Sequence, residues 1–234
     1  MDHNSIDQEP EAASKEAYYR DLRRESKGVG MGLFITAEGM FFLGLIMSYL
    51  LLKAIHTAPS QEALQQNTLV WLCGSIGRTP PDQNYWLPEG LKLPVVITAM
   101  NTGVLLLSSY FMYRAVQVAR NQRFDQAANW LRITAVMGVG FLLVQGYEWG
   151  RMLTHGLTTD PGEGAIFAGL FYTIIGTHGA HVLGGVIFLL LCTKQVLSGM
   201  YDRKEEIQQL VICRNYWFFV CFLWPLLFGL LYFE

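Results

Sequence analysis

The sequence predicts an all-α, polytopic membrane protein with five transmembrane helices. Only 15% of the 234 residues are charged, whereas a soluble domain carries about 25%. Of the 36 charged residues, 12 lie in the first 28 positions. Five later stretches each supply the roughly 20 mostly apolar residues that a spanning helix needs. Backbone groups in lipid must be hydrogen-bonded internally, and these stretches are too long for barrel strands, so the spans are predicted to be helical.

The spans are predicted, in chain order, at residues 29–52, 93–113, 131–150, 165–193 and 211–233. The fourth is the longest, which allows it to tilt. We therefore expect a polar cytoplasmic tail over 1–28 and a membrane domain over 29–234. Within that domain, residues 54–92 form a long outer loop. The amphipathic segment 114–130 is expected to extend the second helix past the membrane.

Basic residues predict the orientation of the chain. The tail and the second and fourth connections hold 13 of the 17 lysines and arginines, and the other side holds Lys53, Arg78, Lys92 and Arg151. The positive-inside rule places the N-terminus in the cytoplasm and the C-terminus outside. Tryptophans at or near span ends are expected to act as interfacial anchors; they are Trp86, Trp130, Trp149 and Trp217.

Composition excludes several classes of protein. The net charge is -2 and no basic patch dominates, which argues against nucleic-acid binding. The four cysteines form no CxxC pair, so a disulfide scaffold or a zinc site is not expected. No axial histidine pair suggests haem held within this chain, and no glycine-rich loop precedes a helix for nucleotide binding.

A few ionisable residues lie inside the predicted spans, where such groups are costly and rare. Glu38 lies in the first span and Glu148 near the outer end of the third. His178 and His181 lie near the centre of the fourth, and their three-residue spacing puts them on one helix face.

Several interpretations of these residues stay open. Glu38 and one or both histidines can form a buried cluster that relays protons or anchors a lipid head group. They can equally serve interhelical hydrogen bonding, or join a metal site of two histidines and two carboxylates. Glu148 is expected at the interface, where Arg151 can pair with it. A row of small residues on the fourth span allows close helix approach, either within this bundle or with another subunit; it comprises Gly176, Ala180 and Gly184.

At this point the motifs resemble those of the cytochrome c oxidase subunit III family of haem-copper oxidases. The resemblance covers residues 28–233 and touches every span. GMGLFITAEGMFF places the family's buried carboxyl at Glu38, and GTHGAHVLGG places its two histidines at His178 and His181. The other matches are YWLPEG, NTGVLLLSS, LVQGYEW and YWFFVCFLW. The resemblance gives structural or lipid-cleft roles to Trp86, Asn101, Thr102, Gln145, Tyr216, Trp217 and Trp224, and a proton-related role to Glu148.

Two features depart from the family pattern. The last helix of the family reads Y-W-H-F-x-D-x-x-W, but here Phe218 and Cys221 stand where the histidine and the aspartate are expected. The chain also has five predicted spans where many members have seven, so it resembles the shorter bacterial form that lacks the first two helices.

The resemblance implies a non-catalytic core subunit in the plasma (inner) membrane of a bacterium. Haem and copper would lie in the catalytic subunit I, which reduces oxygen and pumps protons, and this chain would hold no metal and no catalytic residue. It would pack beside subunit I and other oxidase subunits. It would also bind phospholipid in a cleft between its first two helices and the rest, and support proton uptake.

Three alternatives remain at this stage. One is an accessory membrane subunit of a nitric oxide reductase, because such relatives share the same body. Another is a stand-alone proton-coupled transporter that uses Glu38 and His178 as a relay. The third is a membrane metalloenzyme that uses Glu38, His178 and His181.

Overall fold

Five helices form the part of the chain that the structure describes. A computed structural model describes residues 8–57, 86, 93–159, 164–198 and 203–233. Each helix is long and apolar enough to cross a membrane, which confirms the prediction of an all-α, polytopic membrane protein. The helices are α1 (Gln8–Thr57), α4 (Val95–Arg120), α5 (Phe124–Thr154), α6 (Ala165–Ser198) and α7 (Arg203–Tyr232).

The helices extend beyond the predicted spans. From residue 8 onward the charged tail belongs to the same helix as the first span. The predicted extension of the second helix is confirmed only as far as Arg120, where α4 ends, because residues from Phe124 onward belong to α5. Most of the outer loop, 58–85 and 87–92, lies outside the described residues.

A tight turn joins α4 to α5. The amide of Arg123 donates to the carbonyl of Val118 at 3.2 Å, and the amide of Gln122 donates to that of Ala119 at 2.9 Å. This is the Schellman pattern, in which the residue after the helix adopts a left-handed conformation. Gln122 has a φ of 63°, although glycine is the usual residue there. The turn satisfies the last carbonyls of α4 and brings α5 back antiparallel beside it.

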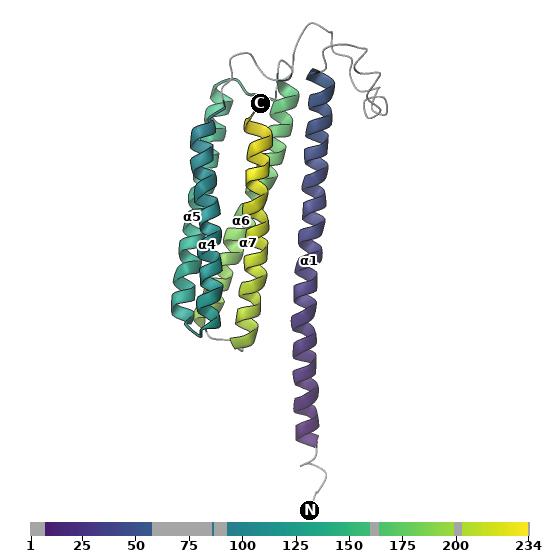
Figure 1. Cartoon of the computed structure of the whole chain (residues 1–234), viewed down its shortest axis with the longest axis vertical. Coiled ribbons are helices and arrows are strands. Elements are labelled where there is room, and N and C mark those ends of the chain that lie inside the picture. The colour runs from purple at the N-terminus through teal and green to yellow at the C-terminus, as the bar shows by residue number, and fades with distance from the viewer. Residues whose placement is uncertain (1–7, 58–85, 87–92, 160–163, 199–202, 234) are drawn as a thin grey trace, which may run out of the picture.

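Helices α4 to α7 form a bundle, and α1 stands to one side against α6 and α7 (Figure 1). The most apolar window of α1 is only 6% buried inside the chain, against 39% to 50% for the other four helices. The second helix, α4, packs against α5 and α7. The expected cleft between the first two helices and the rest is therefore not formed, because α1 alone stands apart.

The helix α1 is far longer than a membrane span. Its 50 residues correspond to about 75 Å at 1.5 Å per residue. Its N-terminal end extends beyond the end of the bundle at which the α4–α5 turn lies, and α6 ends and α7 begins at that same end (Figure 1). The three segments that hold most of the basic residues thus share one end of the molecule.

Trp217 of α7 sits at the centre of the bundle. It is fully buried, and it contacts glycines on two other helices. A Cβ atom at Gly138 of α5 would lie 2.7 Å from the Trp217 ring, and one at Gly185 of α6 would lie 2.9 Å from it. The expected interfacial role of Trp217 is therefore wrong. Trp86 is buried as well, with its ring 5.4 Å from that of Tyr49 and 5.7 Å from that of Phe167.

The predicted row of small residues on α6 divides between two surroundings. A Cβ at Gly176 would lie 3.1 Å from Trp149 of α5, so this position packs inside the bundle. Ala180 and Gly184 are exposed on the described surface. Close helix approach on α6 occurs at Gly176 and also at Gly185, one residue beyond the predicted row.

We predict that Gly138→Ala destabilises the chain by about 1–3 kcal/mol, because the added methyl overpacks the space that Trp217 fills. Gly140→Ala is the matched control, since it lies on the same helix with nothing within 4 Å of its Cβ position, and both changes gain the same helix propensity. Thermal unfolding of the detergent-solubilised chain measures the difference. Equal stability of the two variants would contradict this packing.

Candidate functional site

Glu38 of α1 and His181 of α6 meet in the middle of their helices. The Oε2 atom of Glu38 lies 3.0 Å from Nε2 of His181, and the two side chains are 23% and 18% exposed. The other ring nitrogen of His181, Nδ1, lies 2.8 Å from the backbone oxygen of Thr177. The structure therefore brings Glu38 together with one of the two histidines, as the cluster interpretation expects.

The contact to Thr177 determines where protons can lie. A carbonyl oxygen only accepts hydrogen bonds, so Nδ1 of His181 must carry a proton and donate. Nε2 is then a bare acceptor in the neutral ring, and Glu38 must donate its carboxylic proton to it. If the ring is cationic, Nε2 donates to the Glu38 carboxylate instead. In both states one proton lies between the two side chains.

Aromatic side chains hold this pair in place. The ring of Phe42 lies 5.2 Å from that of His181, edge to face. Tyr216 of α7 donates a hydrogen bond from its hydroxyl to the backbone oxygen of His181 at 3.0 Å, and its ring lies 6.1 Å from that of Phe34. The pair therefore lies where α1, α6 and α7 meet.

His178 faces the bundle interior rather than Glu38. It is fully buried and stacks on Trp224, with ring centroids 5.0 Å apart and planes 25° apart. Phe42 and Phe141 contact it edge to face. Neither ring nitrogen has a hydrogen-bond partner among the described residues. The three-residue spacing thus places the two histidines in different surroundings.

Glu148 turns into the bundle. Its side chain is 1% exposed, and its Oε1 atom accepts a hydrogen bond from Thr98 of α4 at 2.9 Å. On the same helix, Gln145 donates to the Tyr232 hydroxyl of α7 at 3.4 Å. Thr98, rather than the expected Arg151, is thus the hydrogen-bond partner of Glu148. Neither Thr98 nor Tyr232 is among the site residues that the sequence predicts.

Three side chains of α4, namely Asn101, Thr102 and Ser108, form further hydrogen bonds to neighbouring helices. Trp224 donates from Nε1 to Thr102 at 2.9 Å, and Trp217 donates to Ser108 at 3.0 Å. Asn101 donates to the backbone oxygen of Phe141 at 3.2 Å. The seven-residue spacing of the two tryptophans puts them on one face of α7. That spacing is the sequence signal that could have indicated two hydrogen-bond acceptors on one neighbouring helix.

The two departures from the family pattern lie in different places. Cys221 is buried with its sulfur 3.8 Å from the Ser108 hydroxyl. Phe218 is half-buried, and the guanidinium of Arg214 lies 5.9 Å from its ring centre. At the position of the family's aspartate, this chain therefore has a thiol beside a hydroxyl.

A three-residue metal site of Glu38, His178 and His181 is not formed. In the described part of the chain, no group of three His, Cys, Asp or Glu side chains lies close enough to hold a metal ion. The described cysteines are all free thiols in buried positions; they are Cys192, Cys213 and Cys221.

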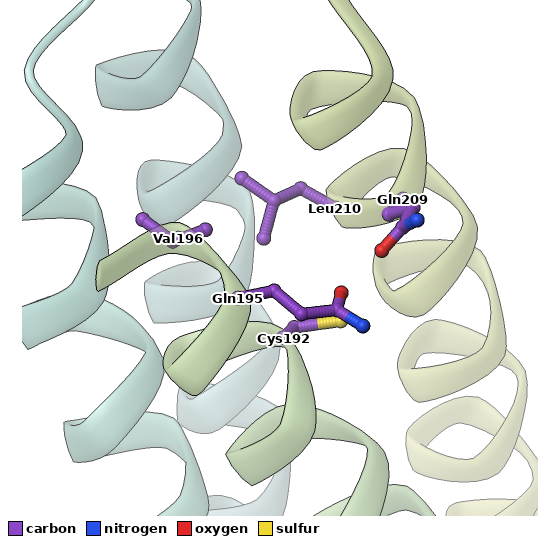
Figure 2. Close-up of a pocket in the computed structure, with 5 residues that line it drawn as sticks. All are labelled: Cys192, Gln195, Val196, Gln209 and Leu210. Carbon is purple, nitrogen blue, oxygen red and sulfur yellow. The ribbon is translucent and has the colours of Figure 1, made fainter. Parts of the chain in front are cut away.

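Two hollows lie near the end of the bundle at which α7 begins. A small one between α6 and α7 is surrounded by Cys192, Gln195, Val196, Gln209 and Leu210 (Figure 2), and it is too narrow to admit a water molecule. A larger groove of about 360 Å³ separates α1 from α6 and α7. Its lining is Lys27, Gly30, Met31, Phe34, Phe188, Gln209 and Ile212.

A sequence profile of the family described as Cytochrome c oxidase subunit III matches residues 13–234. The chain belongs to the cytochrome c oxidase subunit III family. Cytochrome c oxidase subunit 3 of Synechocystis sp. is 31% identical over 205 residues, covering 87% of this chain and 73% of the relative. The Thermostichus vulcanus protein of the same name is 28% identical, covering 87% and 85%. That of a Bacillus species is 29% identical, covering 90% and 87%.

Family membership decides among the alternatives for function. The chain is a subunit III of a haem-copper oxidase and works with other oxidase subunits in a complex. The nitric oxide reductase and transporter alternatives are not favoured. The five apolar helices agree with a multi-pass membrane subunit.

We predict that Glu38→Gln barely alters assembly of subunit III into the complex, because the amide keeps the shape and can donate to His181. Glu38→Ala should weaken assembly more, since it leaves Nε2 of His181 unpaired at a cost of about 1–3 kcal/mol. The yield of subunit III that co-purifies with the complex measures this. Equal loss from both changes would contradict a hydrogen-bonding role for Glu38.

Proposed function

We propose that this chain is a non-catalytic core subunit that stabilises the catalytic subunit and supports proton uptake through its buried polar pair and bound lipid. The Glu38–His181 contact carries the proposal, because it places one proton between two titratable groups inside the spans. An ionisable residue inside a membrane span is, by default, a candidate functional residue. The proposal places haem and copper in subunit I.

The two mid-span histidines, His178 and His181, are engaged in ways that support this assignment. Both ring nitrogens of His181 have partners, namely Glu38 and the carbonyl of Thr177. His178 is enclosed by Phe42, Phe141 and Trp224. An axial haem ligand needs a free ring nitrogen with room for iron beside it, whereas both nitrogens of His181 have partners and aromatic rings enclose His178.

The groove between α1 and the bundle is our candidate for phospholipid. Met31, Phe34 and Phe188 supply apolar walls for an acyl chain, and Lys27 is exposed at one end. A lysine next to the end of a span attracts the phosphate of an anionic lipid. This combination of apolar walls and one cation fits a phospholipid whose head group lies at the Lys27 end.

We also propose that the N-terminus is cytoplasmic, the C-terminus is outside, and the membrane is the inner membrane of a bacterium. The basic residues support this orientation, since the segments that hold 13 of the 17 share one end of the molecule (Figure 1). The positive-inside rule assigns that end to the cytoplasm.

The first test is to remove the chain from the oxidase. We predict that the remaining complex keeps its haem spectrum but loses activity over fewer turnovers, because only support of proton uptake has been lost. Purification of a tagged copy is expected to bring down haem-containing subunits. Stoichiometric haem or copper on the isolated chain would contradict the non-catalytic assignment.

The second test concerns the groove. We predict that Lys27→Gln lowers the amount of phosphatidylglycerol retained by the purified chain about fivefold, since one lysine near the surface contributes about 1 kcal/mol to anionic-lipid binding. Lys194→Gln is the matched control, because Lys194 is an exposed lysine of α6 that does not line the groove. Native mass spectrometry measures bound lipid. Equal retention in the two variants would exclude Lys27 as a head-group ligand.

A further inference from the structure

The helix α1 is attached to the bundle by a narrow line of contacts. Phe34 meets Tyr216, Phe42 meets both histidines, and Tyr49 meets Trp86 and Phe167. The rest of α1 exposes large apolar side chains such as Leu33, Met40 and Met47. Only 6% of its most apolar window is buried in the chain. The polar contact between Glu38 and His181 at mid-span therefore weighs heavily in how α1 is held.

We infer that the Glu38–His181 contact is a proton-dependent clasp that fastens α1 to α6. With Nδ1 of His181 held as a donor by Thr177, the contact needs one proton between Oε2 and Nε2. Loss of that proton leaves a carboxylate facing the lone pair of Nε2 at 3.0 Å, and two acceptors at that distance repel. This inference concerns the attachment of α1 and does not depend on lipid in the groove.

A hydrogen bond between the two side chains is still possible in acid. A second proton makes Glu38 neutral and His181 cationic, and Nε2–H can then donate to the carbonyl oxygen of the Glu38 carboxyl. The docked state thus binds at least one proton that the undocked state can release. By linkage, docking weakens as the pH rises and that proton is lost.

Two other titratable groups lie close to the clasp. His178 lies one turn before His181 on α6, and Phe42 contacts both imidazoles. Tyr216 of α7 donates its hydroxyl proton to the backbone oxygen of His181 and lies near Glu38. Tyr216 holds the backbone of His181 in either state of the clasp, so it does not replace the missing proton.

Two variants separate the proton from the contact. In Glu38→Gln, the amide N–H donates to Nε2 of neutral His181, and the amide oxygen accepts from cationic His181. The clasp is then closed at every pH. In Glu38→Ala it is open at every pH. Thr36→Ala is the matched control, because the Thr36 hydroxyl is exposed and bonds only within α1, to the backbone of Gly32.

The test measures the separation of α1 from α7 in the full chain in lipid nanodiscs. Spin labels at Met47→Cys and Leu226→Cys, both exposed positions, report that distance by pulsed electron resonance. Cys73 is replaced by serine, and the three described cysteines are buried. Distances are recorded between about pH 5 and about pH 9, the range that brackets histidine titration.

In the otherwise wild-type chain, we expect the ratio of docked to undocked α1 to fall by up to about tenfold per pH unit above the point of proton loss. Glu38→Gln should stay docked throughout, and Thr36→Ala should follow the wild type. A pH-independent wild type, or Glu38→Gln with the same pH dependence as the wild type, would overturn the inference. These two comparisons decide the outcome even where Glu38→Ala fails to fold.

Discussion

Lipid offers no hydrogen-bond partner, so a polar group that is paired inside the spans is paired within the protein. This constraint explains the pattern of hydrogen bonds in the chain. Thr36, Ser48 and Thr193 donate to the carbonyl four residues earlier in their own helices. Trp217 and Trp224 donate across to hydroxyls of α4. The Glu38–His181 pair follows the same rule with titratable groups, so its bond depends on a proton.

The bundle of α4 to α7 and the helix α1 meet this constraint in different ways. In the bundle of α4 to α7, Trp217 fills the space between Gly138 and Gly185, and its N–H reaches Ser108. Packing and hydrogen bonding thus reinforce one another there. Helix α1 meets the bundle through the aromatic rings of Phe34, Phe42 and Tyr49 and through the Glu38 carboxyl. Attachment of α1 is therefore the part of the fold most open to regulation by protonation or by lipid.

Much of this arrangement could be predicted from the sequence, because apolar length and period decide the existence and order of the spans. The isolated charge of Glu38 and the spacing of His178 and His181 singled out the residues of the candidate site. Periodicity predicts which side of a helix packs against the protein, but not which neighbouring helix it contacts. Consequently, the sequence did not separate the two histidines. It also placed Trp217 at the interface and missed Gly185 as a point of close approach.

The proton state of His181 tests the account most directly. Solid-state nitrogen NMR of the histidine-labelled chain, with His181→Gln used to assign the signals, reports which ring nitrogens carry protons. The account predicts a protonated Nδ1 in every state, with Nε2 either accepting a hydrogen bond from a neutral Glu38 or donating one to its carboxylate. A neutral His181 with a bare Nδ1 and a protonated Nε2 would contradict it, since the bond to Thr177 would then be lost.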